Sequence, residues 1–261
     1  MKYPVLFLVL LAFAACASRQ SPETVVVSGR VTDFDGNPID SVTVGWMNPA
    51  FNGQYYATTD ADGRYCARIP RGRYAYAGGI NMAEYPNAGS TLPDAAQRLE
   101  NWHWNYIAHR DTTFDFRYHR LEVYGLNAFQ VQGATPGYTV YFRPMSLTRS
   151  QAWTRAGMPA GDNGLAPSID SARIEVTIDG EPVKIRMAQQ VKEYFDDANW
   201  SGAYLLFVDR PKADSPVKTF RIVMEDTGNG DKGEATYTLE EKSAADYIWP
   251  EGEIDANYKA R

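Results

Sequence analysis

Cysteine and histidine are the scarcest side chains of chemical interest in this chain. Its 261 residues include two cysteines, Cys16 and Cys66, and three histidines. Two cysteines cannot build a network of disulfides, so a small disulfide-stabilised fold is excluded. Cys66 lies in a strand-like stretch, where we expect a small buried hydrophobic residue rather than a nucleophile.

Charge is not concentrated anywhere along the sequence. The chain has 26 basic and 32 acidic residues and a net charge of −6, spread without blocks of one sign. We therefore expect no electrostatic attraction to nucleic acid.

Familiar catalytic motifs are absent from the sequence. It contains no Gly-x-Ser-x-Gly, no Walker loop and no His-Glu-x-x-His. His103, His109 and His119 fall within seventeen residues, but their spacings of six and ten fit no common zinc motif, so solvated or packed histidines are the better interpretation. We predict no catalytic residues, no metal and no cofactor, and hence a protein that is not an enzyme. A cleft with converging acidic side chains of strongly shifted pKa would revive an enzymatic role.

The sequence also has no apolar run long enough to span a bilayer, which takes about 20 residues. Its one marked apolar run, at 5–15, follows Lys2, as in a secretion signal. The next residues, Phe13-Ala14-Ala15-Cys16, resemble the lipobox of bacterial lipoproteins, although those usually have Leu where Phe13 stands.

This resemblance implies a lipoprotein signal peptide at 1–15, lipid attachment at Cys16 and a tether at 16–23. The lipid would then bind the protein to a membrane. An ordinary signal peptide cut after Ala15 or Ala17 is the alternative.

Residues 24–118 alternate between strand-like stretches and turns, as in a β-sandwich. Four pieces resemble the carboxypeptidase regulatory-like family, a transthyretin-like sandwich of seven strands. These are a Gly-x-Val strand, an Asp-x-x-Gly-x-Pro-Ile turn, a Thr-Asp-x-x-Gly-x-Tyr hairpin and a Pro-x-Gly-x-Tyr turn, at 29–31, 33–39, 59–65 and 70–74. The resemblance implies a non-catalytic module found on many surface and envelope proteins. The last turn is expected to place Tyr74 and Tyr76 on one face.

An insertion at 81–111 interrupts the family's pattern. We predict a short helix at 91–100 and, directly after it, an extended segment with alternating aromatic residues. In an extended chain Trp102, Trp104 and Tyr106 share one face, so the rings would form a platform for the apolar face of a sugar, with His103 nearby to hydrogen bond. The alternative is that these large rings are buried, either filling the gap between modules or covering a sheet edge.

Residues 119–245 predict a second β-sandwich, followed by a polar tail at 246–261. A strand at 172–178 and an Asp179-Gly180 turn leading to 183–187 give the strongest hairpin signal, and 203–208 is apolar enough for a central strand. A long loop at 146–167 is predicted to hold a brief helix near 149–153. The hairpin around 226–234 resembles those of immunoglobulin-like domains of bacterial surface proteins. Its oxygen-rich loop suggests turn formation first and a calcium site second.

The sequence thus predicts an all-β protein with two tandem sandwiches, transthyretin-like and then immunoglobulin-like, and a short helix in the insertion of the first. It resembles envelope lipoproteins of Bacteroidetes-type bacteria. The residues after Cys16, Ala17-Ser18-Arg19-Gln20, lack the Asp that retains lipoproteins in the inner membrane, which favours the outer membrane and leaves the periplasmic or surface side open. The first hypothesis is a non-catalytic lipoprotein that binds a glycan or an envelope protein through the aromatic insertion. The alternative is a structural or assembly component, such as a pilus-type subunit or an accessory of an outer-membrane complex.

Overall fold

The computed structural model describes residues 23–87, 90–131, 133, 136–213 and 215–242. The predicted signal peptide at 1–15, Cys16 and the predicted tail at 246–261 lie outside the described residues. Within the described part of the chain, no helix is both long and apolar enough to cross a membrane.

The described residues fold almost entirely into strands, which confirms the predicted all-β class. The strands are β1 (Thr24–Thr32), β2 (Thr43–Met47), β3 (Gly53–Thr58), β4 (Arg64–Pro70), β5 (Gly72–Ile80), β6 (Asn101–Ala108), β7 (Thr112–Thr113), β8 (Phe116–Arg117), β9 (Leu121–Phe129), β10 (Tyr138–Ser146), β11 (Ala172–Ile178), β12 (Glu181–Pro182), β13 (Ile185–Tyr194), β14 (Trp200–Val208), β15 (Val217–Asp226) and β16 (Lys232–Glu240). The helix α1 (Leu147–Arg155) and the 3-10 turns η1 (Asp94–Ala96) and η2 (Ile169–Ser171) complete the described elements.

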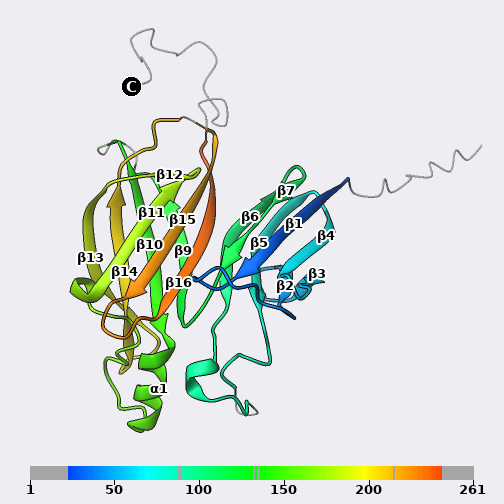
Figure 1. Ribbon diagram of the computed structural model, residues 1–261. Helices are drawn as coiled ribbons and strands as arrows, with labels where there is room; N and C mark the ends of the chain where they lie inside the picture. Colours follow the sequence, from blue (N-terminus) through cyan, green and yellow to red (C-terminus); the bar gives the residue numbers. More distant parts are fainter. Residues whose placement is uncertain (1–22, 88–89, 132, 134–135, 214, 243–261) are drawn as a thin grey trace, which may run out of the picture.

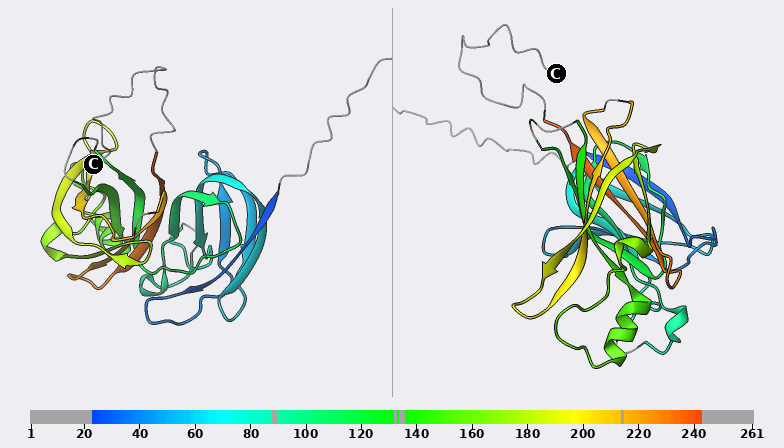
Figure 2. Two further views of the ribbon diagram at one scale, coloured as in Figure 1. Left: turned by 90° about the horizontal axis from the view of Figure 1, so that it is seen from above. Right: turned by 90° about the vertical axis from the view of Figure 1, so that its left-hand side faces the viewer.

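Two β-sandwiches stand side by side (Figures 1 and 2). In the first, a sheet of order β4-β1-β7, with β8 also paired to β1, faces the strands β6-β5-β2-β3. In the second, a sheet of order β13-β14-β10-β9 faces the strands β12-β11-β15-β16. The buried hydrophobic residues form two matching clusters, one within 25–118 and the other, apart from Trp104, within 121–235.

The two sandwiches are joined through one continuous sheet, which the sequence did not reveal. β6 pairs in parallel with β16, so that eight strands run in the order β12-β11-β15-β16-β6-β5-β2-β3. The register places Trp102 opposite Ala235 and Trp104 opposite Tyr237. The strand supplied by the insertion is therefore the structural link between the two halves of the chain.

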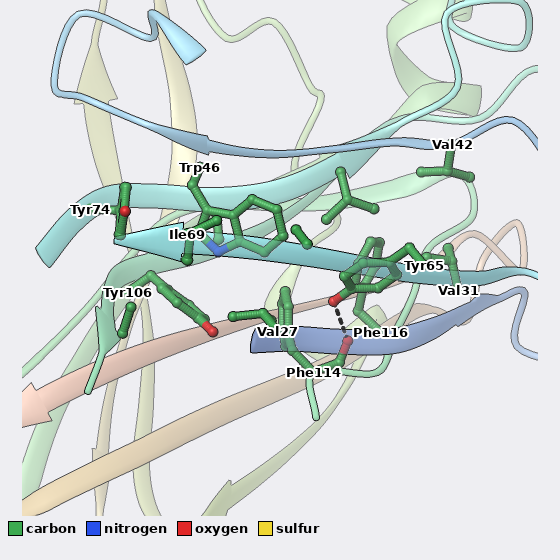
Figure 3. Close-up of a cluster of buried hydrophobic side chains, with 14 of the residues drawn as sticks. Val27, Val31, Val42, Trp46, Tyr65, Ile69, Tyr74, Tyr106, Phe114 and Phe116 are labelled. Carbon is green, nitrogen blue, oxygen red and sulfur yellow. Dashed lines mark hydrogen bonds between the residues drawn. The ribbon is translucent and has the colours of Figure 1, made fainter. Parts of the chain in front are cut away.

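An aromatic cluster fills the first sandwich (Figure 3). Trp46 on β2 is fully buried, and its ring centroid lies 6.4 Å from those of Tyr65 and Tyr106. The Tyr65 hydroxyl donates a hydrogen bond of 2.5 Å to the backbone carbonyl of Phe114. This bond gives the buried hydroxyl a partner and ties β4 to the segment before β8.

The predicted turns occur where expected, but at two of the predicted hairpins the chain moves to the facing sheet at or soon after the turn. The Asp60–Gly63 turn connects β3, in the eight-stranded sheet, with β4, which pairs with β1. The Asp179-Gly180 turn closes a hairpin with only the two residues of β12, after which the chain crosses to the facing sheet as β13. The strand at 203–208 is central as predicted, because β14 lies between β13 and β10.

The predicted helix at 91–100 is wrong, whereas the brief helix predicted near 149–153 is confirmed as α1. The insertion forms only the single turn η1. Its backbone N–H groups then bond to distant carbonyls, that of Arg98 to Glu84 and that of Leu99 to His119. These long-range bonds replace the helical ladder and carry the chain into β6.

Candidate functional site

The aromatic residues of β6 do not form the predicted platform. Asn105 has a φ of 51°, and the inside-outside alternation changes phase there. His103 and Tyr106 consequently pack with the first core, whereas Trp102 and Trp104 lie on the opposite face. Trp104 is 9% exposed and Tyr106 is 4% exposed, so neither ring is open to a ligand.

Tyr74 and Tyr76 on the neighbouring strand show the same change of phase. Tyr74 belongs to the first core, and Tyr76 packs against the second cluster beside Trp104, with ring centroids 4.8 Å apart. The expectation that these two tyrosines share a face is therefore also wrong.

His103 is a core residue in this structure. Its Nε2 lies 2.7 Å from the Thr238 hydroxyl of β16, and its ring stands edge-on to Tyr106 and Phe114. Burial lowers the pKa of His103 to about 3, so the ring is neutral at physiological pH. His109 is exposed and His119 is half-buried, and the three histidines do not converge.

In the acidic loop at 226–234, the carboxylates of Asp226 and Asp231 form ion pairs with arginines. Asp226 accepts from Arg149 Nε at 2.6 Å. Asp231 accepts from Arg120 Nε at 3.2 Å, from the Ser146 hydroxyl at 2.6 Å and from the backbone and hydroxyl of Thr148. These contacts hold the first turn of α1 against the loop. Among the described residues, no cluster of three or more His, Cys, Asp or Glu side chains is arranged to hold a metal ion.

Trp102 is half-buried and belongs to a different arrangement, a row of four residues across four neighbouring strands. The registers place Trp102 of β6 opposite Gly78 of β5, Gly78 opposite Gly45 of β2, and Gly45 opposite Tyr56 of β3. A Cβ built on Gly45 would lie 3.1 Å from the Tyr56 ring, and one built on Gly78 would lie 3.5 Å from the Trp102 ring. The two rings thus lean toward each other over a floor without side chains.

The space between these rings is a cavity of about 170 Å³, which we call the trough. Its walls are mainly apolar, with Met47 and Ile80 beside the four residues of the row and Glu100 at one end. Tyr56 is 59% exposed and forms the outer wall. With neighbouring strands about 4.8 Å apart, the row from Trp102 to Tyr56 spans about 14 Å.

Two neighbouring carboxyl groups lie next to the trough, the half-buried Glu100 in its wall and the buried Glu122 behind Trp102. Glu122 of β9 is 3% exposed and accepts a 2.6 Å hydrogen bond from Trp102 Nε1. Its carboxyl group contacts that of Glu100, which also accepts from the Tyr85 hydroxyl. Burial raises the pKa of both glutamates, that of Glu122 well above its usual value, and the neighbouring carboxyl group adds to the effect on Glu122.

A larger cavity of about 520 Å³ lies between α1 and the insertion. Its polar side chains bond to one another: Gln151 donates to Gln97 at 3.1 Å, and Arg155 pairs with Asp94 at 2.9 Å across the exposed rim. These contacts use part of the hydrogen-bonding capacity of the cavity within the protein itself.

Sequence reasoning missed most of the trough. It named Trp102, but Tyr56, Gly45 and Gly78 meet it only through the long-range register of the sheet. It also expected Cys66 to be buried, whereas the thiol is exposed on the outer face of β4. The only signal for the trough was the occurrence of glycines within strands, which often marks a place where another group approaches the backbone closely.

Comparison with known proteins gives little further guidance. No protein-family model and no curated protein matches the chain. Among solved structures, a DUF3823 family protein from Parabacteroides merdae is similar over 85% of this chain and 100% of its own, at 12% identity and a TM-score of 0.26. The major pilin subunit of Bacillus cereus is similar over 85% of this chain and 70% of its own, at 9% identity and a TM-score of 0.25. TM-scores this low support no conclusion about function.

Proposed function

We propose that this protein is a non-catalytic lipoprotein of a bacterial cell envelope and that it binds a glycan in the trough. The observation that carries the proposal is the row Trp102, Gly78, Gly45 and Tyr56, in which two aromatic rings flank a floor of backbone. Aromatic faces stack on the C–H faces of sugar rings, and the glycine floor leaves room for such a ring to approach. The trough thus takes over the role first assigned to the buried rings of β6.

The carboxyl pair next to the trough does not suggest a glycosidase. Such enzymes hold two carboxyl groups about 5 Å apart or about 6.5–9.5 Å apart, with the sugar between them. Glu100 and Glu122 instead touch each other, and Glu122 is 3% exposed, so no sugar fits between them.

Binding of the full chain to an immobilised glycan array, followed by calorimetry with each bound oligosaccharide, tests the proposal. We expect Tyr56→Ala to weaken binding at least about tenfold, which corresponds to about 1.4 kcal/mol. Tyr56 is well suited to this test because it is largely exposed and belongs to neither hydrophobic cluster. Phe129→Ala is the matched control, since Phe129 is 43% exposed at the far end of β9. Equal affinities for Tyr56→Ala and the unchanged protein would contradict the proposal.

The lipid anchor is a separate part of the proposal. It rests on the likeness of 13–16 to a lipobox, with Cys16 as the acylated residue. Mass spectrometry of the mature N-terminus from a bacterial membrane fraction would show the added lipid, and Cys16→Ala is expected to release the protein from that fraction. An unmodified terminus after Ala15 or Ala17 would contradict the anchor.

A role in envelope assembly is the second candidate function. The observation in its favour is β13, an edge strand of its sheet, in which Met187 and Tyr194 are 42% and 60% exposed, while the next residue, Phe195, is 50% exposed. Unpaired strand edges can add a strand from another protein. A photo-crosslinking residue at position 194 is expected to trap an envelope partner in cells, and a chain that remains uncrosslinked would count against this candidate.

A further inference from the structure

Glu100 and Glu122 meet where the two sandwiches join, and each comes from a different half of the chain. Glu100 lies within the insertion, immediately before β6, whereas Glu122 is the second residue of β9. Tyr85 of the insertion donates to Glu100, and Trp102 of β6 donates to Glu122. The pair therefore links the insertion, the trough and the second sandwich.

One buried oxygen of the pair has no hydrogen-bond donor. Glu100 Oε2 is buried, and no described group donates a hydrogen bond to it. The neighbouring carboxyl group of Glu122 brings only acceptors when it is ionised. A proton held between the two carboxyl groups would supply the absent donor and remove the repulsion between two negative charges.

The charged and titratable groups around the pair do not replace this proton. Arg143 of β10 is the cation that acts on Glu122, but it pairs with Glu193 at 3.1 Å and lies 4.9 Å above the Tyr124 ring. Tyr85 and Tyr124 also face the pair. Burial, with a further contribution from the two carboxyl groups, raises the pKa of both phenols, so these tyrosines stay neutral.

We propose that Glu100 and Glu122 share one proton and that this proton fixes Trp102 in the wall of the trough, so that its loss at higher pH loosens the insertion and weakens binding. The effect on binding rests on the proposed function, whereas the shared proton does not. When the proton leaves, two carboxylates remain in contact with little water around them. Glu100 is the side that moves, because it is half-buried and precedes its strand, whereas Glu122 is held within the β9–β10 ladder.

The direction of the pH dependence follows from the raised pKa of both groups. Their stabilising effect is fully present below the ordinary glutamate pKa of about 4.3 and is lost as the pH rises through the raised values of the folded state. Between the ordinary glutamate pKa and those raised values, each pH unit raises the opening equilibrium by up to about tenfold, and above the raised values the equilibrium levels off. The wall of the trough is therefore held most rigidly at mildly acidic pH.

Hydrogen exchange of the full chain between about pH 5 and 9 tests the shared proton without any ligand. After correction for the intrinsic exchange rate, we expect peptides covering 90–108 to lose protection by up to about tenfold per pH unit until the pH reaches the raised pKa values of the pair, and then to level off. Glu100→Gln supplies a permanent N–H donor and is expected to abolish that slope. Glu175→Gln, which removes an exposed glutamate of β11, is the matched control and should retain it. A pH-independent protection in the unchanged protein, or the same slope in Glu100→Gln, would overturn the proposal.

A binding titration separates this inference from the proposed function. Cellohexaose and maltohexaose serve as probes, along with any oligosaccharide found on the array. If the unchanged protein binds more weakly at high pH and Glu100→Gln removes this pH dependence, the proposed regulation is supported. An affinity of the unchanged protein that is constant with pH overturns it. If no sugar binds at any pH, the proposed function fails, and the exchange experiment alone decides whether the proton is shared.

Discussion

The substitution Trp104→Ala would open a cavity where the two sandwiches meet. Trp104 comes from β6 of the first sandwich but packs in the second core, with ring centroids 4.8 Å from Tyr76, 5.3 Å from Trp102 and 4.9 Å from Tyr124. An indole buries about 200 Å², which at about 25 cal/mol per Å² corresponds to about 5 kcal/mol. Measured losses for buried aromatics replaced by alanine are about 3–5 kcal/mol, so we expect a loss of about 4 kcal/mol.

Guanidinium unfolding of the full chain, followed by circular dichroism, measures this loss. Trp104→Phe should cost less than about 1.5 kcal/mol, because it keeps most of the ring and removes Nε1, which is buried without a hydrogen-bond partner. Trp153→Ala, on the half-exposed side of α1, is the matched control and should change stability least. A loss below about 1 kcal/mol for Trp104→Ala, or equal losses for the two Trp104 variants, would refute the reasoning.

Three further predictions follow from other contacts. Asp231→Asn leaves the buried Arg120 without a carboxylate and should lower the free energy of unfolding by about 3–5 kcal/mol, measured by the same guanidinium assay; an unchanged midpoint would contradict the role given to this pair. The neutral His103, whose pKa is lowered to about 3, should make stability fall as the pH drops below about 6.5, by up to about 1.4 kcal/mol per pH unit, and His103→Gln should remove this contribution from a series of unfolding curves at pH 7 to 5. Cys66 should react with a thiol reagent in the folded protein as fast as in denaturant, whereas a protected thiol would show that its face of β4 is covered.

The strands could be predicted because each depends on a few neighbouring residues. Two-residue alternation, as in β10 and β11, and turns such as Asp179-Gly180 are local signals. The pairing of strands is not local. The turn at 179–180 joins two strands that pair with each other, whereas the similar turn at 60–63 joins strands of different sheets. Which of these happens depends on which distant strand has a free edge for pairing.

The site was less predictable for two separate reasons. The platform on β6 failed at Asn105, whose positive φ reverses the phase of the strand; Asn takes this conformation more readily than most residues, so a weak signal was present. The trough could not be found at all from the sequence. Tyr56 and Trp102 are 46 positions apart, and only the order of four strands brings their rings over the same two glycines.

Parallel pairing of β6 with β16 makes each half of the chain a template for the other. A fragment cut after residue 118 would carry β6 with one edge bare and Trp104 in water, and a fragment starting at 119 would bare the matching edge of β16. Bare edges beside aromatic surface drive aggregation. Expressed separately, the halves should precipitate, and expressed together from two genes they should recover each other by complementation.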